Sequence, residues 1–230
     1  MAYLDDEIKG WSTGEWEVPE WTFDGNPALI INHMQKGIVG TGLFSGAPID
    51  QEWARMKELG TIDMQKKLIA AFRERNLPVI FVSVVPNPIG VEPKWGFIYQ
   101  MNGMCAPKGR LNNPELAEAC EIIPEMGKLP EEPVFYHTGS CPLTGSHLEE
   151  YLRLHHVTDV VITGWTIHST LYNTAVQMSN AWFNVVCPYD ASGAPARDQE
   201  CADIVINKMM RMWGLVTTTD DVIAHLPDNK

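Results

Sequence analysis

The chain has 230 residues, of which 45% are apolar, and it carries a formal net charge of −12 at pH 7. This length and composition predict one globular domain with a substantial core and argue against extensive disorder. The acidic balance argues against nucleic acid and anionic membrane surfaces as partners, because both repel a negatively charged protein.

The cysteine pattern and the beginning of the chain favour a cytoplasmic protein. The five cysteines are scattered and contain no C-x-x-C pair, which argues against a disulfide framework or a zinc ribbon. The first residues are acidic and lack the apolar core of a signal peptide. No apolar run approaches the ~20 residues that span a bilayer.

Residues 1–27 are predicted to form an irregular N-terminal arm, and residues 28–230 a single α/β domain. Trp11, Trp16 and Trp21 are spaced by five residues among Glu, Gly and Pro. Such large aromatic side chains bury much area. We favour their packing on their own domain, and packing on a neighbouring subunit is the alternative.

In the first half of the domain, two apolar runs predict buried strands over residues 28–32 and 79–85. Apolar residues at helical spacing predict a helix over residues 62–75 between them. The glycine-rich residues 37–48 are expected to be a loop. Residues 86–113 form a long connection, which inside a compact domain is typical of a functional or interface element.

Helices and strands also alternate through the second half, where Gly164 is expected to end the central strand. The predicted helices cover residues 114–122, 146–155, 169–183 and 196–213. The predicted strands cover residues 134–136, 160–163, 185–188 and 215–218. Cys187 and Cys201 fall in a predicted strand and a predicted helix, and both are expected to lie in the core.

This alternation of helices with continuously apolar strands predicts a parallel sheet covered by helices on both faces. In such sheets, ligands bind beyond the carboxyl ends of the strands, near the point where strand order reverses. Three predicted strands end on polar groups, at His33, at His137 and at residues 166–170. We therefore expect His33, His137 and Thr170 to face one small pocket.

Four segments resemble, in order, motifs of the isochorismatase-like or cysteine hydrolase superfamily: ALIINHMQ, HTGSCPLTGSHL, VVITGWTIHSTLYNTA and YDASGA. The resemblance covers residues 27–226. It implies a three-layer, doubly wound, mostly parallel six-stranded sheet with helices on both faces, and a homodimer or homotetramer. It also implies a cis peptide bond between Trp165 and Thr166, which turns backbone N–H groups toward an oxyanion.

The resemblance breaks at the catalytic positions. The family uses an Asp, a Lys and a Cys, and matching the motifs places His33, His137 and Thr170 at these positions respectively. A hydroxyl needs a base to become a nucleophile, whereas a thiol ionises near pH ~8.5. Imidazole donates, accepts and titrates near neutrality. The cysteine mechanism therefore does not transfer to this chain.

Three hypotheses fit this site. In the first, His33 is the general base for Thr170 or a water, His137 stabilises charge, and the protein hydrolyses a small amide, carbamoyl compound or vinyl ether without a cofactor. In the second, the site binds a small molecule without hydrolysing it. In the third and least favoured, His33, His137 and His168 hold a catalytic metal, although no H-x-H or H-E-x-x-H spacing supports it.

Further residues are candidates for the surroundings of the site. Cys141 lies four residues after His137, and a buried spectator thiol is favoured over a relocated Cys–His pair. Trp95, Phe97 and Tyr99 are expected either to wall the pocket or to pack at an oligomer interface.

Overall fold

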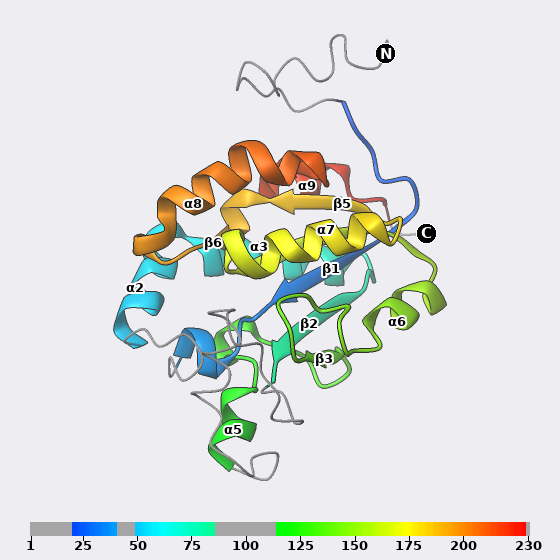
Figure 1. Cartoon of the computed structure of the whole chain (residues 1–230). Coiled ribbons are helices and arrows are strands. Elements are labelled where there is room, and N and C mark those ends of the chain that lie inside the picture. Colours follow the sequence, from blue (N-terminus) through cyan, green and yellow to red (C-terminus); the bar gives the residue numbers. More distant parts are fainter. Residues whose placement is uncertain (1–19, 41–48, 86–113, 229–230) are drawn as a thin grey trace.

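The computed structural model describes residues 20–40, 49–85 and 114–228, and within them the expected three-layer α/β fold is confirmed (Figure 1). The strands are β1 (Asn26–Asn32), β2 (Val79–Val84), β3 (Val134–His137), β4 (Val157–Trp165), β5 (Asn184–Pro188), β6 (Ser192–Gly193) and β7 (Leu215–Thr217). They pair in the order β3-β2-β1-β4-β5-β7, with β6 beside β4. All of these pairings are parallel.

Helices cover both faces of this sheet. The α-helices are α2 (Ile49–Leu59), α3 (Thr61–Glu74), α5 (Pro114–Ala119), α6 (Leu148–Leu154), α7 (Tyr172–Asn180), α8 (Gln199–Ile204) and α9 (Thr219–His225). Short 3-10 or π turns are η2 (Lys36–Gly40), η3 (Pro124–Met126), η4 (Ile167–Leu171), η5 (Tyr189–Ala191), η6 (Ala196–Asp198), η7 (Val205–Met209) and η8 (Met210–Met212). Among the described residues, no helix is long and apolar enough to cross a membrane.

Alternation of side chains along the strands divides the core into two layers. Ile30 of β1 and Ile162 of β4 face one layer, which includes apolar residues of α6, α7 and α8. Ile31 and Val161 face the other, which includes apolar residues of α2, α3 and α9. Figure 1 shows α7 in front of the sheet and α3 behind it. Strands buried on both faces explain the continuous apolar runs in the sequence.

The order of the strands reverses between β1 and β4. From β1 the chain proceeds outward to β2 and β3, and it then returns to place β4 on the other side of β1. The connections therefore leave β1 and β4 in opposite directions beyond their carboxyl ends. In doubly wound sheets this is where ligands bind.

Several elements differ from the sequence-based expectations. Helix α2 was not predicted, and residues 36–40 form the turn η2 where a loop was expected. The central strand does not end at Gly164, because Gly164 and Trp165 continue it by pairing with the short, unpredicted strand β6. The helix expected over residues 196–213 is divided into η6, α8, η7 and η8. Pairing and packing with distant segments decide these details.

The arm and the cysteines give two agreements and one correction. Trp21 packs on its own domain: its indole Nε1 donates to Asp221 Oδ2 at 2.9 Å, and its ring stacks on His225. Cys187 lies in the core, as expected. The prediction for Cys201 was wrong, because its side chain is exposed while the adjacent Ala202 faces the sheet. Trp11 and Trp16 lie outside the described residues.

Candidate active site

His33 follows the last residue of β1 and turns the backbone away from the sheet. Its φ of 56° lies in the left-handed region, which few residues without a short polar side chain adopt. Its N–H still donates to Val82 O of β2 at 2.9 Å. The imidazole is 4% exposed, so the end of β1 delivers it into the protein interior.

His137 is the last residue of β3 and is fully buried. Strand β2 lies between β1 and β3, yet the rings of the two histidines are in contact. Their Nε2 atoms are 2.8 Å apart, and their ring planes are inclined by 16°. This distance is a hydrogen bond, in which one Nε2 carries a proton and the other accepts it.

Thr170 lies in the turn η4, between the end of β4 and α7. Its Oγ1 is 3.2 Å from His33 Nδ1, and the residue is 3% exposed. The structure thus brings His33, His137 and Thr170 into one hydrogen-bonded chain, although His33 and Thr170 are 137 residues apart in sequence. The chain lies at the reversal between β1 and β4.

Burial keeps both imidazoles neutral at pH 7. It lowers the pKa of His33 well below 6.5, and the neighbouring His137 lowers this pKa further. Burial also lowers the pKa of His137 to about 4, an effect that the backbone of Gly139 and Cys141 partly offsets. A second positive charge next to the first would be strongly unfavourable here. The pair therefore accepts at most one additional proton.

Two tautomeric arrangements satisfy the hydrogen bonds between neutral rings. In one, His33 Nε2–H donates to His137, which leaves His33 Nδ1 free to accept the Thr170 proton. In the other, His137 Nε2–H donates to His33 Nε2, and His33 Nδ1–H donates to Thr170 Oγ1. His137 Nδ1 has no partner that meets hydrogen-bond geometry. The first arrangement is the one in which His33 can act as a base toward Thr170.

The lowered pKa values make stability depend on pH. In the unfolded chain a histidine has a pKa near ~6.5, so between about pH 4 and 6.5 the unfolded state binds more protons than the folded state. The contribution of the neutral histidines to the free energy of unfolding is fully present above pH 6.5 and is lost as the pH falls. From pH 7 to pH 5 we expect His137 alone to reduce the free energy of unfolding by about 2 kcal/mol.

Urea unfolding at the two pH values measures this loss. A His137→Leu variant should lose less stability on acidification than the wild-type protein. A His147→Gln variant, changed at an exposed histidine, is the matched control. Equal losses in the wild-type protein and His137→Leu would contradict the expected pKa.

The backbone at Trp165 and Thr166 has the form that the resemblance implies, since the peptide bond between them is cis. The Trp165 side chain is 1% exposed and belongs to the core layer beneath α2 and α3. Thr166 lies directly before η4 with an extended backbone. The indole ring of Trp165 is therefore part of the core.

The three histidines of the metal hypothesis do not converge. The side chain of His168 lies next to Asp198, with 3.8 Å between Nε2 and Oδ2. Burial lowers its pKa, while Asp198 raises it and Arg197 lowers it. Within the described ranges, no group of three His, Cys, Asp or Glu side chains is arranged to hold a metal ion. These residues do not fit a catalytic metal.

Cys141 is 1% exposed, and burial raises its pKa to about 11. The thiol is therefore neutral at pH 7 and is a poor nucleophile, which favours the spectator interpretation. Trp95, Phe97 and Tyr99 lie outside the described residues.

Sequence reasoning gave Gln35 only a structural role and did not consider Asn32. Both are fully buried and close to His33 in sequence. Asn32 Nδ2 donates to Thr163 O, while Gln35 Nε2 donates to Val84 O. Polar residues at the end of a buried strand were the available signal.

The fold and the site together define a doubly wound α/β protein with polar side chains gathered at the reversal of strand order. A family model described as the isochorismatase domain matches residues 27–221. The chain belongs to the isochorismatase family.

Individual relatives agree with this assignment. An uncharacterized isochorismatase family protein, YrdC of Bacillus subtilis (strain 168), is 26% identical over 176 residues, which are 75% of this chain and 76% of that protein. The structure of an isochorismatase family protein from Burkholderia thailandensis is similar with a TM-score of 0.67 and 26% identity, over 91% of this chain and 99% of that chain. N-carbamoylsarcosine amidase from Thermoplasma acidophilum shares the fold, with a TM-score of 0.60 and 19% identity, over 85% and 98% of the two chains.

Proposed function

We propose that this protein is a hydrolase of a small molecule that carries an amide, carbamoyl or vinyl-ether group, and that Thr170, His33 and His137 replace the cysteine machinery. The observation that supports this is the hydrogen-bonded chain from Thr170 Oγ1 to His33 Nδ1 and from His33 Nε2 to His137 Nε2. A hydroxyl next to an imidazole that a third group orients is the general arrangement of an activated nucleophile. The similar fold of an amidase is consistent with the proposal.

For an amide or carbamoyl substrate, Thr170 Oγ1 forms a bond to the carbonyl carbon while its proton passes to His33 Nδ1. The resulting imidazolium shares its Nε2 proton with neutral His137. His33 then gives the abstracted proton to the leaving nitrogen as the carbon–nitrogen bond breaks. A water, deprotonated by the same imidazole, releases the product from Thr170. The backbone N–H groups near Trp165 and Thr166 are proposed to bind the oxyanion.

The low pKa values of the histidines affect this reaction in two ways. Because both are lowered, the base is in its proton-accepting form throughout neutral pH. The same burial weakens it as a base, because the imidazolium is poorly solvated. This weakness favours a second candidate, in which the site binds a small molecule through neutral hydrogen bonds and does not hydrolyse it.

A substrate panel separates the two candidates. Small amides, carbamoyl compounds and vinyl ethers are incubated with the pure protein and with a His33→Ala variant, and product is quantified by mass spectrometry. We expect turnover of at least one class by the wild-type protein and a loss of about 10²- to 10⁴-fold in the variant, the usual contribution of general-base catalysis. Equal rates in both proteins, together with retained ligand binding, would favour the binding candidate.

We also propose that the protein acts in the cytoplasm as a homodimer or homotetramer, as its family resemblance implies. Exposed apolar side chains support an interface. Trp182, at the end of α7, is 90% exposed, and Leu154, at the end of α6, is 75% exposed. Burial of these two side chains between subunits would remove their apolar surface from water.

A further inference from the structure

The contact between His33 and His137 requires that three strand ends keep their relative positions. The two histidines belong to β1 and β3, and β2 separates these strands. Neighbouring strands lie ~4.8 Å apart, so the rings reach toward each other across the end of β2. Any displacement of the end of β1 relative to β2 changes the distance between the two Nε2 atoms.

The backbone hydrogen bonds between β1 and β2 extend only as far as His33. The ladder between the two strands runs from the pair Leu29–Val79 to the pair Asn32–Val82, with one further bond from His33 N–H to Val82 O. Beyond His33 the left-handed backbone turns away from β2. Val84, at the end of β2, is therefore left without a backbone partner from β1.

The side chain of Gln35 supplies that partner. Its Nε2 donates to Val84 O at 3.0 Å and to Ala119 O at 3.1 Å, and its Oε1 accepts from Val84 N–H at 2.7 Å. The amide thus pairs with both backbone groups of Val84, as a neighbouring strand would. Gln35 is fully buried, and three hydrogen bonds use both of its donors and its acceptor.

Val84 connects Gln35 to the second histidine. In the ladder between β2 and β3, Val84 pairs with His137, and Val85 N–H donates to His137 O at 2.8 Å. The amide of Gln35, two residues after His33, is therefore linked through one residue of β2 to the backbone of His137. No other side chain among the described residues is shown to make both contacts with Val84.

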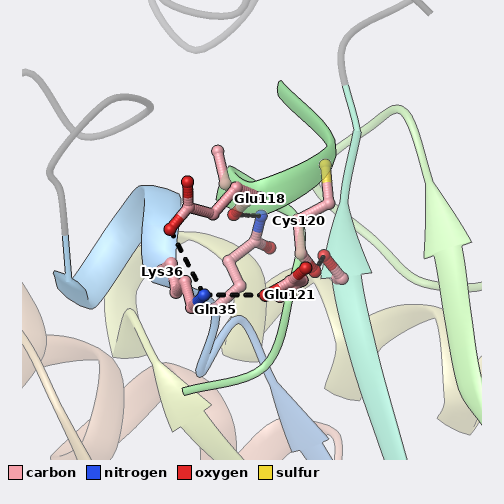
Figure 2. Close-up of polar contacts among 7 residues, drawn as sticks. Gln35, Lys36, Glu118, Cys120 and Glu121 are labelled. Atoms are coloured by element: carbon pink, nitrogen blue, oxygen red, sulfur yellow. Dashed lines mark hydrogen bonds and ion pairs between the residues drawn. The ribbon is translucent and has the colours of Figure 1, made fainter. Parts of the chain in front are cut away.

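The neighbouring contacts have a different function. Lys36 forms ion pairs at the surface with Glu118 and Glu121, at 3.4 and 2.7 Å, and Figure 2 shows this pair of contacts beside the buried amide. Exposed pairs of this kind contribute little to stability. They attach the end of α5 and the residues after it to η2 without reaching Val84.

We propose that Gln35 is a positioning residue, whose side-chain amide fixes the ends of β1 and β2 so that His33 and His137 form their hydrogen bond. This inference rests on the proposed function for its effect on catalysis, but its effect on the histidine pair is independent of any substrate. Gln35 acts through His33 and does not contact the reacting atoms.

The test compares Gln35→Glu with Lys36→Met. The carboxylate of Gln35→Glu has nearly the shape of the amide but cannot donate to the carbonyl groups of Val84 and Ala119. Protein labelled with ¹⁵N-histidine is studied by long-range ¹H–¹⁵N correlation spectra, which distinguish donor from acceptor ring nitrogens. In Gln35→Glu we expect loss of the donor–acceptor pattern of the two Nε2 atoms, and in Lys36→Met we expect this pattern unchanged.

Activity gives the second measurement on whichever substrate the panel identifies. A displacement near 1 Å at a catalytic group costs about 10²-fold in rate, so Gln35→Glu should lower kcat about 100-fold with KM changed less than about threefold. Lys36→Met should retain wild-type kcat. An intact histidine pattern in Gln35→Glu, or an equal loss in Lys36→Met, would overturn the inference. If the wild-type protein turns over no substrate, the proposed function fails, while the spectra still test the role of Gln35.

The wild-type protein provides the answer if Gln35→Glu does not fold. Exchange of the Gln35 side-chain amide protons is followed with the histidine signals through subdenaturing urea concentrations. The inference requires that the protection of the Gln35 amide protons and the hydrogen-bond pattern of the two histidines disappear in the same opening event. A histidine pair that persists after the Gln35 amide has exchanged, or that is lost while the amide stays protected, would exclude the positioning role.

Discussion

A Thr170→Val variant is expected to lose kcat/KM by about 10³-fold or more, because valine has nearly the shape of threonine but no hydroxyl to attack the substrate. The hydroxyl is the group that lies 3.2 Å from His33 Nδ1. The loss is measured by steady-state kinetics on the substrate that the panel identifies. Far-ultraviolet circular dichroism and urea unfolding establish that the variant is folded.

Thr170→Ser is the matched control for this substitution. It keeps the hydroxyl within reach of His33 and should retain activity within about tenfold, since only the methyl group is lost. If His33 instead activates a water, Thr170→Val will remain active while His33→Ala will not. That result would remove Thr170 as the nucleophile and leave His33 as the base.

A Gly164→Ala variant is expected to be destabilised by about 4 kcal/mol or more, which is a large part of the stability of an ordinary domain. A Cβ at this position would lie 2.1 Å from Asn32 O and 2.8 Å from both Asn32 C and Asn32 N. These are backbone atoms of β1, paired in register with Gly164, so they cannot move without breaking the two central strands apart. The φ of 127° adds strain for any side chain.

The Gly127→Ala variant separates the strain of a left-handed backbone from the steric contact of an added Cβ with a neighbouring strand. Gly127 also has a positive φ, of 57°, but a Cβ there would meet nothing within 4 Å. Its replacement should therefore cost only about 1–2 kcal/mol, the usual penalty of a left-handed conformation. Both free energies of unfolding are obtained from urea titrations. If the two variants are equally destabilised, the close approach of β4 to β1 is not the reason that residue 164 is a glycine.

The fold was largely predictable because its strongest signals are local. Runs such as residues 28–32 and 79–85 are apolar at every position, and this pattern is typical of strands covered on both faces. The structure has β1 and β2 at these places, with β1 two residues longer at its beginning. Where pairing is with distant residues, as for Gly164 and Trp165 with β6, the local sequence gave no signal.

The site was predictable in part. Matching motifs and strand ends brought His33, His137 and Thr170 to attention, and the structure places these side chains within hydrogen-bond distance. His168 was also considered, but the rotation of the helix after β4 directs it toward Asp198. The direction of a side chain on a helix depends on how that helix packs, which spacing alone does not reveal.

By itself, the sequence determined which segments become buried strands and helices, and so the class of the fold, because hydrophobic periodicity acts over a few residues. The tertiary structure decided the contact between His33 and His137, which are 104 residues apart and lie on strands separated by β2. It also decided that the buried amide of Gln35 pairs with Val84. Distances of this kind depend on the register of three strands at once, and only the assembled sheet fixes them.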